Sequence, residues 1–384
     1  MSTGGELDAV ELLERLASID SRNPDLAPDS DGERAVAETT ADVLSELGME
    51  VSLHDVVDGR PNVIGVLPGD ETAGTFVLEA HLDTVPATPE GRVVERRGSR
   101  LHGRGTADTK GSLAGMIAAA DRIRRRRGPR PTVVVCGAVD EEFVMRGARA
   151  LLDQLPPVDG VVIGEPTSLR SIRAHNGFIR VRVVAEGVSA HSSLALLGVN
   201  AITAAARCVV TLEDKLGAHL HDRHHPLTGP ALLTATMVEG GIAPNIVPDQ
   251  CAVWFDRRLA PAERPEDALA EIDAVLDQLR SDGHRLVRDE PLIALPGLET
   301  DASDALVTAA ETVCGPSAGV TYSTDACYLN GYGDLSCIVL GPGSIDQAHT
   351  VDEWIEIDQV YRSVDVYEQV VLAAARTKGT DIPT

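Results

Sequence analysis

The segment VVVCGAVDEEF, residues 133–143, joins an apolar run to three consecutive acids, Asp140, Glu141 and Glu142. Its apolar part is short and rich in valine, which is typical of a strand buried on both faces. Adjacent carboxylates repel one another and raise each other's pKa, so their position at the end of such a strand needs a physical reason. Either the three acids simply face solvent, or a positive charge lies among them.

Similar apolar segments surround this one. NVIGVLPG (62–69), TFVLEAHL (75–82) and GVVIGEP (160–166) each read as a short strand followed by loop residues. Helical patterns alternate with them at 6–18, 31–47, 109–126 and 146–155. This alternation predicts the α/β class, with a layered sheet whose functional sites lie beyond the carboxyl ends of the strands.

A different order of elements follows, and it predicts a second domain. Strands are expected at 178–187, 231–241, 250–259 and 284–290, with helices at 198–216 and 264–281. This order is βαββαβ, the ferredoxin-like arrangement. We therefore predict that residues 178–288 form a compact unit inserted into a first domain made of residues 1–177 and 289–384.

The composition excludes several classes of protein. With 384 residues and 43% hydrophobic side chains, the chain can bury a large core. A net charge of −25 argues against nucleic acid or an anionic membrane as a partner. No apolar run reaches the roughly 18 residues of a membrane span. The N-terminus lacks a signal-peptide pattern, and the six cysteines form no CxxC pair, so we predict a cytoplasmic protein with reduced thiols.

Metal-capable residues follow the predicted strands of the first domain. His81 and Asp83 come after TFVLEA, and Glu165 comes after GVVIG. Asp108 opens a helix after the glycine-rich turn HGRGTADTKG, and GPGSIDQAHT supplies His349. A single pair of acids is usually a solvated face or a helix cap. The repeated placement of such residues directly after apolar strands instead favours one shared site.

The types of side chain indicate the chemistry of that site. Imidazoles and carboxylates without thiolates suit zinc, cobalt or manganese in a hydrolytic centre. A catalytic zinc usually has three protein ligands, so five candidates are too many for one ion. They suit two ions about 3.5–4 Å apart that share one carboxylate. One acid would then remain as the base that accepts a proton from water.

These segments resemble a known family. HLDTVP, GRGTADTKG, DEEF, GEPTS, AHSS and GPGSIDQAHTVDEW are similar to the dimetal aminoacylase and carboxypeptidase superfamily, and most similar to its acetylornithine deacetylase and succinyl-diaminopimelate desuccinylase branch. The resemblance runs from residue 81 to residue 354. It implies two divalent ions, with Zn²⁺ favoured and Co²⁺ or Mn²⁺ as alternatives. His81 and Glu165 would hold one ion, Glu142 and His349 the other, and Asp108 would bridge them.

The resemblance also implies roles for residues that hold no metal. Glu141 would be the general base, and Asp83 would fix the tautomer of His81. The inserted unit would be a lid and dimerisation domain, in which His191 reaches the partner subunit's site and stabilises the oxyanion. Asn245 and Arg258 would bind the substrate carboxylate, which suits the two-pronged guanidinium. The charges of the two ions would explain why three acids can stand side by side.

The chain departs from the family pattern at two places. VMRGARA follows DEEF where a glycine-rich turn is usual, so Met145 and Arg146 replace small residues. His102 stands where an aromatic residue is expected, and we interpret it as a packed loop residue. The histidine-rich segment HLHDRHH (219–225) is interpreted as a solvated loop.

The predicted protein is a homodimeric, two-metal amidohydrolase that acts on an N-acyl amino acid, most similar to acetylornithine deacetylase. Alternatives with the same metal centre are a dipeptidase or carboxypeptidase and a succinyl-diaminopimelate desuccinylase. A metal-binding protein without catalysis is a further alternative, which Glu141 disfavours because metal binding alone needs no base. A nucleotide-binding protein is disfavoured because GRGTADTKG lacks the phosphate-loop pattern.

Overall fold

A computed structural model describes residues 5–379 and groups them in two compact units. Unit 1 holds the described residues up to Arg173, the segment Thr300–Ala318, and those from Thr324 onward. Unit 2 holds Ala174–Glu299 and Gly319–Ser323. Strands β8 (Ile172–His175) and β19 (Ala318–Val320) begin in unit 1 and end in unit 2.

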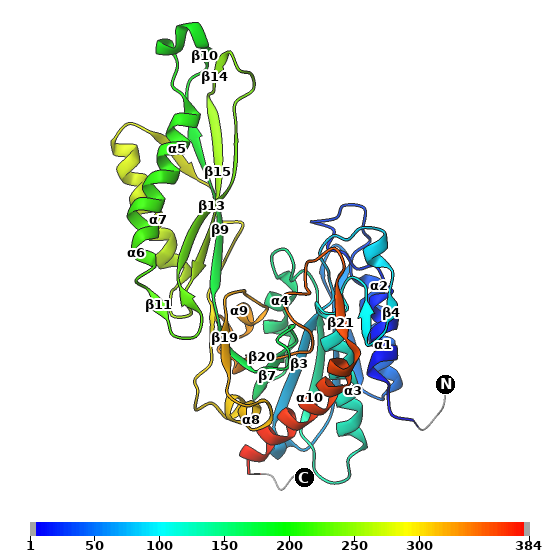
Figure 1. The fold of residues 1–384 in the computed structure, drawn as a ribbon. Coiled ribbons are helices and arrows are strands. Elements are labelled where there is room, and N and C mark those ends of the chain that lie inside the picture. Colours follow the sequence, from blue (N-terminus) through cyan, green and yellow to red (C-terminus); the bar gives the residue numbers. More distant parts are fainter. Residues whose placement is uncertain (1–4, 380–384) are drawn as a thin grey trace. The chain divides into compact units, whose positions relative to one another are not determined.

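Unit 1 alternates strands and helices along most of its length (Figure 1). Its further elements, in chain order, are α1 (Ala9–Ala17), α2 (Arg34–Glu46), β1 (Glu50–Val57), β2 (Arg60–Leu67), η1 (Glu71–Ala73), β3 (Thr75–His81), η2 (Glu90–Arg92), β4 (Glu95–Arg97), β5 (Arg100–His102), α3 (Lys110–Arg125), β6 (Thr132–Ala138), α4 (Arg146–Gln154), β7 (Gly160–Ile163), α8 (Ala305–Cys314), α9 (Ala326–Leu329), β20 (Cys337–Val339), β21 (Trp354–Glu356) and α10 (Ile357–Thr377).

The main sheet of unit 1 is mixed, with strands in the order β1-β2-β6-β3-β7-β20. β3 runs parallel to both β6 and β7, and β20 runs parallel to β7. β1 and β2 form an antiparallel edge. The central strands β6 and β7 are almost wholly buried, which agrees with their apolar sequences. The sheet is the α/β architecture that the alternating pattern predicts.

Helices cover both faces of this sheet. Side chains of α1, α2, α3, α8 and α10 share one hydrophobic core with the sheet, whereas α4 packs with α9 (Figure 1). The α3–α10 contact is close because α3 carries Gly115, where an added Cβ would lie 2.2 Å from Ser363 Oγ. Asp8 caps α1 by accepting the backbone N–H groups of Val10 and Glu11.

A small sheet in unit 1 supports the loop that precedes α3. Its strands lie in the order β21-β5-β4, and β21 pairs with β5 in the register Ile355↔Leu101. β21 directly precedes α10, which packs on α3. Both ends of the loop 103–109 are therefore attached to buried structure.

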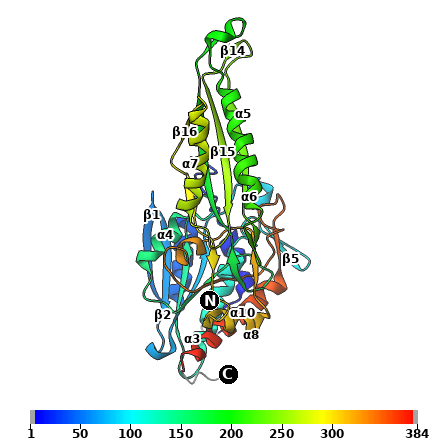
Figure 2. The ribbon, with the colours of Figure 1, turned by 90° about the vertical axis from the view of Figure 1, so that its left-hand side faces the viewer.

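Unit 2 contains an antiparallel sheet with strands in the order β13-β15-β9-β16. Its helices α5 and α7 lie on one face of that sheet, as the two views show (Figures 1 and 2). Its elements, in chain order, are β9 (Gly177–Glu186), β10 (Ala190–His191), η3 (Ser192–Leu197), α5 (Ala201–Leu212), η4 (Glu213–Gly217), α6 (Ala218–Leu220), β11 (His224–His225), β12 (Gly229–Pro230), β13 (Leu232–Gly240), β14 (Ile246–Val247), β15 (Gln250–Leu259), α7 (Pro265–Ser281), β16 (Arg285–Arg288), β17 (Ile293–Leu295) and β18 (Leu298–Glu299).

The helices of unit 2 begin at residues that suit a helix N-terminus. Asn200 accepts the backbone N–H of Thr203 at the start of α5, and α7 begins with Pro265. Apolar residues of both helices pack with β9 and β15 in a core of their own. Among residues 5–379, no helix combines the length and the apolarity that crossing a bilayer requires.

Candidate metal centre

The parallel strands of unit 1 bring the predicted ligands to one edge of the sheet. His81 is the last residue of β3, Glu142 lies in the loop after β6, and Glu165 follows β7. Because β3 pairs in parallel with both β6 and β7, the carboxyl ends of these three strands are neighbours. Asp108 lies just before α3, and His349 lies in the loop between β20 and β21.

Asp108 lies between the two imidazoles. Its Oδ1 is 3.0 Å from Nε2 of His81, and its Oδ2 is 3.3 Å from Nε2 of His349. His349 Nε2 is also 3.1 Å from Oε2 of Glu142, and His81 Nε2 is 3.8 Å from Oε1 of Glu165. The structure therefore brings all five predicted ligands together, with one oxygen of the central carboxylate directed at each imidazole.

Burial and mutual repulsion perturb the acids of this cluster. Burial, together with repulsion from Asp325 and Glu142, raises the pKa of Glu141 well above its usual value. Burial and the charge of Asp108 do the same to the pKa of Glu165. Burial also raises the pKa of Glu142. A positive charge among these carboxylates is therefore favourable.

The two imidazoles respond in the opposite sense. Hydrogen bonds with Asp108 and Glu142 raise the pKa of His349 to about 10. Burial alone would lower the pKa of His81, but the carboxylates of Asp108 and Asp83 outweigh it and raise that pKa well above its usual value. Both rings are thus surrounded by groups that attract a cation.

The donor set fits divalent metal ions. Ligand atoms of His81, Asp108 and Glu142 all lie within 4.8 Å of one another. With Glu165 and His349, the donors are two imidazoles and three carboxylates, which suit zinc, cobalt and manganese. The charge of one or two divalent ions would also offset the repulsion that raises the pKa values of the acids.

The ring of His81 is oriented by the residue that the resemblance associates with it. His81 Nδ1 lies 3.0 Å from the backbone carbonyl oxygen of Asp83 and 3.6 Å from its carboxylate Oδ1. A carbonyl oxygen can only accept, so Nδ1 carries the hydrogen in this contact and Nε2 faces Asp108. Asp83 therefore orients the ring through its main chain, with its carboxylate close by.

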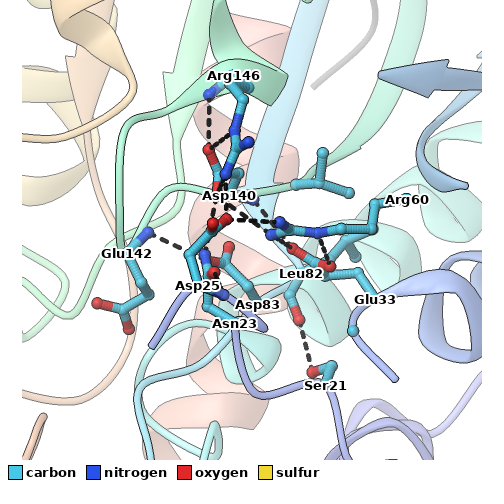
Figure 3. Close-up of polar contacts among 12 residues, drawn as sticks. Ser21, Asn23, Asp25, Glu33, Arg60, Leu82, Asp83, Asp140, Glu142 and Arg146 are labelled. Carbon is cyan, nitrogen blue, oxygen red and sulfur yellow. Dashed lines mark hydrogen bonds and ion pairs between the residues drawn. The ribbon is translucent and has the colours of Figure 1, made fainter. Parts of the chain in front are cut away.

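The Asp83 carboxylate has other donors, which Figure 3 shows. It accepts the backbone N–H of Glu141 at 3.0 Å and that of Glu142 at 3.1 Å. The side-chain amide of Asn23 donates to it at 2.7 Å. Asp83 is fully buried, and it ties the end of β3 to the loop that carries Glu141 and Glu142.

A second buried carboxylate supports the other side of the centre. Glu353 accepts the backbone N–H of Ala107 at 2.9 Å and that of Asp108 at 3.1 Å. Arg104 donates to it at 2.6 Å. Glu353 is 2% exposed, so it holds the main chain of Asp108 in a region that water does not reach.

The other predicted site residues lie in unit 2. His191 is exposed, and its Nδ1 lies 2.8 Å from Oγ of Ser193. Asn245 lies just before β14, and its carbonyl accepts the backbone N–H of Ser192. Arg258 is the penultimate residue of β15, and its Nε lies 2.7 Å from Oδ1 of Asp256. A carboxylate bound by Arg258 would therefore compete with Asp256.

The features that the sequence analysis discounted have ordinary contacts. His102 is 9% exposed, lies 3.0 Å from Asp352 and packs near Trp354. In the segment 219–225, His225 lies 3.1 Å from Glu299. Among residues 5–379, the group of potential metal ligands whose ligand atoms lie close together is His81, Asp108 and Glu142.

Several residues of this region were not identified from the sequence. Asn23, Glu33 and Arg60 lie far along the chain from the loop they support, and no motif marks them. Glu353 stands in the quoted segment GPGSIDQAHTVDEW, four positions beyond His349, so its proximity in sequence to a predicted ligand was an available signal.

Comparisons with known proteins give a consistent result. Residues 77–373 match the peptidase family M20/M25/M40. The chain is 31% identical over 378 residues to the acetylornithine deacetylase of Vibrio atlanticus (strain LGP32), which covers 94% of this chain and 97% of that protein. The aminopeptidase PepT from Bacillus cereus ATCC 10987 has a similar fold, with a TM-score of 0.79 at 21% identity over 97% and 100% of the chains. Bacillus subtilis YXEP, described as a dinuclear metal-binding peptidase, aligns with a TM-score of 0.71 at 15% identity over 96% and 98% of the chains.

Proposed function

Because the chain belongs to peptidase family M20/M25/M40 and is thus a hydrolase of amide bonds, we propose that it removes the acyl group from an N-acyl amino acid. The 31% identity to an acetylornithine deacetylase over 94% of the chain supports this substrate class. The observation that carries the proposal is the position of Asp108 between two imidazoles, with the acidic pair Glu141 and Glu142 beside it.

We assign the metal ligands as the resemblance implies, and the contacts around Asp108 support the assignment. His81 and Glu165 would hold one ion, Glu142 and His349 the other, and Asp108 would bridge them. Zn²⁺ is our first choice, with Co²⁺ or Mn²⁺ as alternatives. When bound, such ions would polarise the amide carbonyl and lower the pKa of the attacking water.

The acid–base chemistry is assigned to Glu141. Its main chain is held by Asp83, and no hydrogen bond of its carboxylate is found among residues 5–379. In our proposal this carboxylate takes the proton of the attacking water and then gives it to the leaving amine nitrogen. Burial and the neighbouring acids raise the pKa of Glu141 above its usual value, which favours this carboxylate as a proton acceptor.

Unit 2 is proposed to be the ferredoxin-like lid and dimerisation domain predicted at 178–288. Its sheet order β13-β15-β9-β16 is the order that a βαββαβ chain adopts in that arrangement. His191 would then stabilise the oxyanion in the partner subunit's site, and Asn245 and Arg258 would bind the substrate carboxylate. The cytoplasmic location stays a prediction.

An apolar surface of unit 2 supports the proposed homodimer. A groove of about 420 Å³ lies between α5 and β13 and is lined by Ile202, Met237 and Val238. These side chains are 44%, 56% and 68% exposed. Apolar surface of this kind often marks a protein interface. If unit 2 joins two copies, Ile202→Asp will shift a dimer toward monomers in analytical ultracentrifugation; a wild-type monomer or an unaffected dimer would contradict this assignment.

A substrate panel tests the reaction. Amine release would be measured from N-acetyl-ornithine, other N-acetyl amino acids, N-succinyl-diaminopimelate and simple dipeptides, with added Zn²⁺ or Co²⁺ and with chelator. Metal-dependent turnover of an N-acyl amino acid is the expected result. Turnover of dipeptides alone would instead make the chain a peptidase, the activity named for the PepT and YXEP neighbours.

A further inference from the structure

The loop that carries Glu141 and Glu142 has two strained ends. Asp140 begins it with φ 71°, and Met145 ends it with φ 56°, so both non-glycine residues adopt the left-handed conformation. Such conformations persist only where the surrounding structure enforces them. Two main-chain hydrogen bonds close the loop, one from Met145 N to Asp140 O at 2.7 Å and one from Gly147 N to Val139 O at 3.0 Å.

The Asp140 side chain holds the first strained end, and arginine is its principal partner (Figure 3). Arg146 places Nε 2.6 Å from Asp140 Oδ2 and Nη2 3.0 Å from Oδ1, which is a two-pronged contact. Its backbone N–H also points to Oδ2 at 3.3 Å. The Arg146 guanidinium lies 5.9 Å from the centroid of the Phe143 ring, so it covers the loop as well.

Two further groups connect Asp140 to the metal centre. Arg60 donates to Asp140 Oδ1 at 3.2 Å, but the same guanidinium is also bound by Glu33 at 2.6 Å. Asn23 donates to Asp140 at 3.0 Å and to Asp83 at 2.7 Å. Asp83 accepts the backbone N–H groups of Glu141 and Glu142. One connected network therefore holds the Asp140 carboxylate and the loop that carries these two glutamates.

The charge balance of this network depends on Arg146. Asp140 and Glu33 are fully buried acids. Arg60 contacts both of them, and Arg146 contacts Asp140. Without Arg146, the buried carboxylates of Asp140 and Glu33 would share the guanidinium of Arg60. A buried carboxylate that loses a hydrogen-bonded partner is destabilised, so Asp140 would change its position.

We propose that Arg146 is a positioning residue of the metal centre: it holds Asp140 and thereby fixes the orientation of Glu141 and Glu142. This inference rests on the proposed function, because it takes Glu141 as the base and Glu142 as a metal ligand. It also assigns a role to a residue that stands where the family pattern has a small one. Arg146 contacts Asp140 and Asp25, so its effect on chemistry is indirect.

The test compares Arg146→Ala and Arg146→Lys with the matched control Arg149→Ala. Arg149 is exposed and lies one turn further along α4, so its removal changes the net charge of the same helix equally. Chelator-treated proteins would be titrated with Co²⁺ by isothermal titration calorimetry. We expect Arg146→Ala to lower the Co²⁺ affinity of the site assigned to Glu142 and His349 tenfold to hundredfold, in the range typical of residues that orient metal ligands. Arg146→Lys retains the charge without the fork and should fall between.

Kinetics supplies the second measurement, on the panel substrate that the wild type turns over fastest. Arg146→Ala should lower kcat and leave KM unchanged, because substrate contacts are untouched. Co²⁺ affinity and kcat both within twofold of wild type would overturn the inference, and so would an equal loss in Arg149→Ala. If Arg146→Ala does not fold, Arg146→Gln decides by the same criteria. The Co²⁺ titration needs no substrate. If no panel substrate is turned over, the proposed function fails, and the Co²⁺ affinities of the variants still decide this inference.

Discussion

The two imidazoles of the centre are held in very different ways. His81 ends a central strand, is 2% exposed, and has its Nδ1 bound to the main chain of Asp83. His349 lies in a loop with a side chain that is 54% exposed, and the contacts of its Nε2 are to Asp108 and Glu142. The buried half of the centre is therefore part of the folded core, whereas the exposed half is held by charge.

This contrast has a physical consequence for assembly of the site. The contact of His81 Nδ1 forms when the end of β3 folds, because it is made to the main chain of Asp83, two residues away. His349 contacts Asp108 and Glu142, two acids that repel each other. Its position therefore depends on a positive charge that offsets this repulsion. We expect the ion at His81 and Glu165 to be bound more tightly than the ion at Glu142 and His349.

The largest expected effect is on kcat, and it comes from a substitution that leaves the proposed ligands of both ions in place. Glu141→Gln keeps the shape of the side chain but removes its ability to accept a proton. We expect kcat to fall roughly a hundredfold to ten-thousandfold, while calorimetry still detects two ions. Retained activity would show that another group is the base, and loss of one ion would make Glu141 a ligand.

Replacing each imidazole tests the contrast directly. His81→Ala and His349→Ala should each remove one tight ion in a Co²⁺ titration. In urea unfolding of the metal-free proteins, His81→Ala should lower the unfolding free energy by about 1–3 kcal/mol, because a buried imidazole is lost and the two groups that it bonds, Asp108 and the carbonyl of Asp83, stay buried without it. The half-exposed His349→Ala should cost less than about 1 kcal/mol. Equal costs would mean that the two halves are equally part of the core.

A smaller effect is expected on the support of the buried half. Glu353→Gln keeps one acceptor for the main chain of Asp108 but removes the charge that faces Arg104. Metal affinity should fall about tenfold, the lower end for such supporting residues, and mainly for the ion at His81. Glu356→Gln is the control, since Glu356 binds Arg100 at the surface. A loss confined to the ion at His349 would contradict this division.

The smallest effect on the centre should come from His175, a fully buried histidine of unit 2. Burial lowers its pKa from 6.5 to about 4, despite a hydrogen bond to the main chain. Between these values the unfolded chain binds a proton that the folded chain does not, so stability falls as the pH drops from about 6.5 to about 4. His175→Gln should flatten that slope in urea unfolding and leave Co²⁺ binding at neutral pH unchanged. A persistent slope would assign the acid sensitivity to other groups.

The strands buried on both faces of the main sheet were predictable, whereas its edge strand β1 was not. β3, β6 and β7 coincide with the apolar segments TFVLEA, TVVVCGAV and GVVIG, because burial on both faces requires apolar side chains. β1 was not predicted. It is an edge strand in which no residue is fully buried, and it carries polar residues such as His54 and Asp55. It is held by main-chain pairing with β2 that any sequence can make.

The candidate ligands were predictable for a related reason. Metal ligation needs particular side chains, and their position after apolar strands can be read along the chain. The local pattern of the chain therefore decided the fold class and the types of the candidate ligands. Only the tertiary structure shows the supporting network. Asn23 and Asp140 are 117 positions apart, and a contact over that distance leaves no periodicity or spacing in the sequence. The sheet brings these residues together, and only their packing shows that Arg146 faces a buried carboxylate.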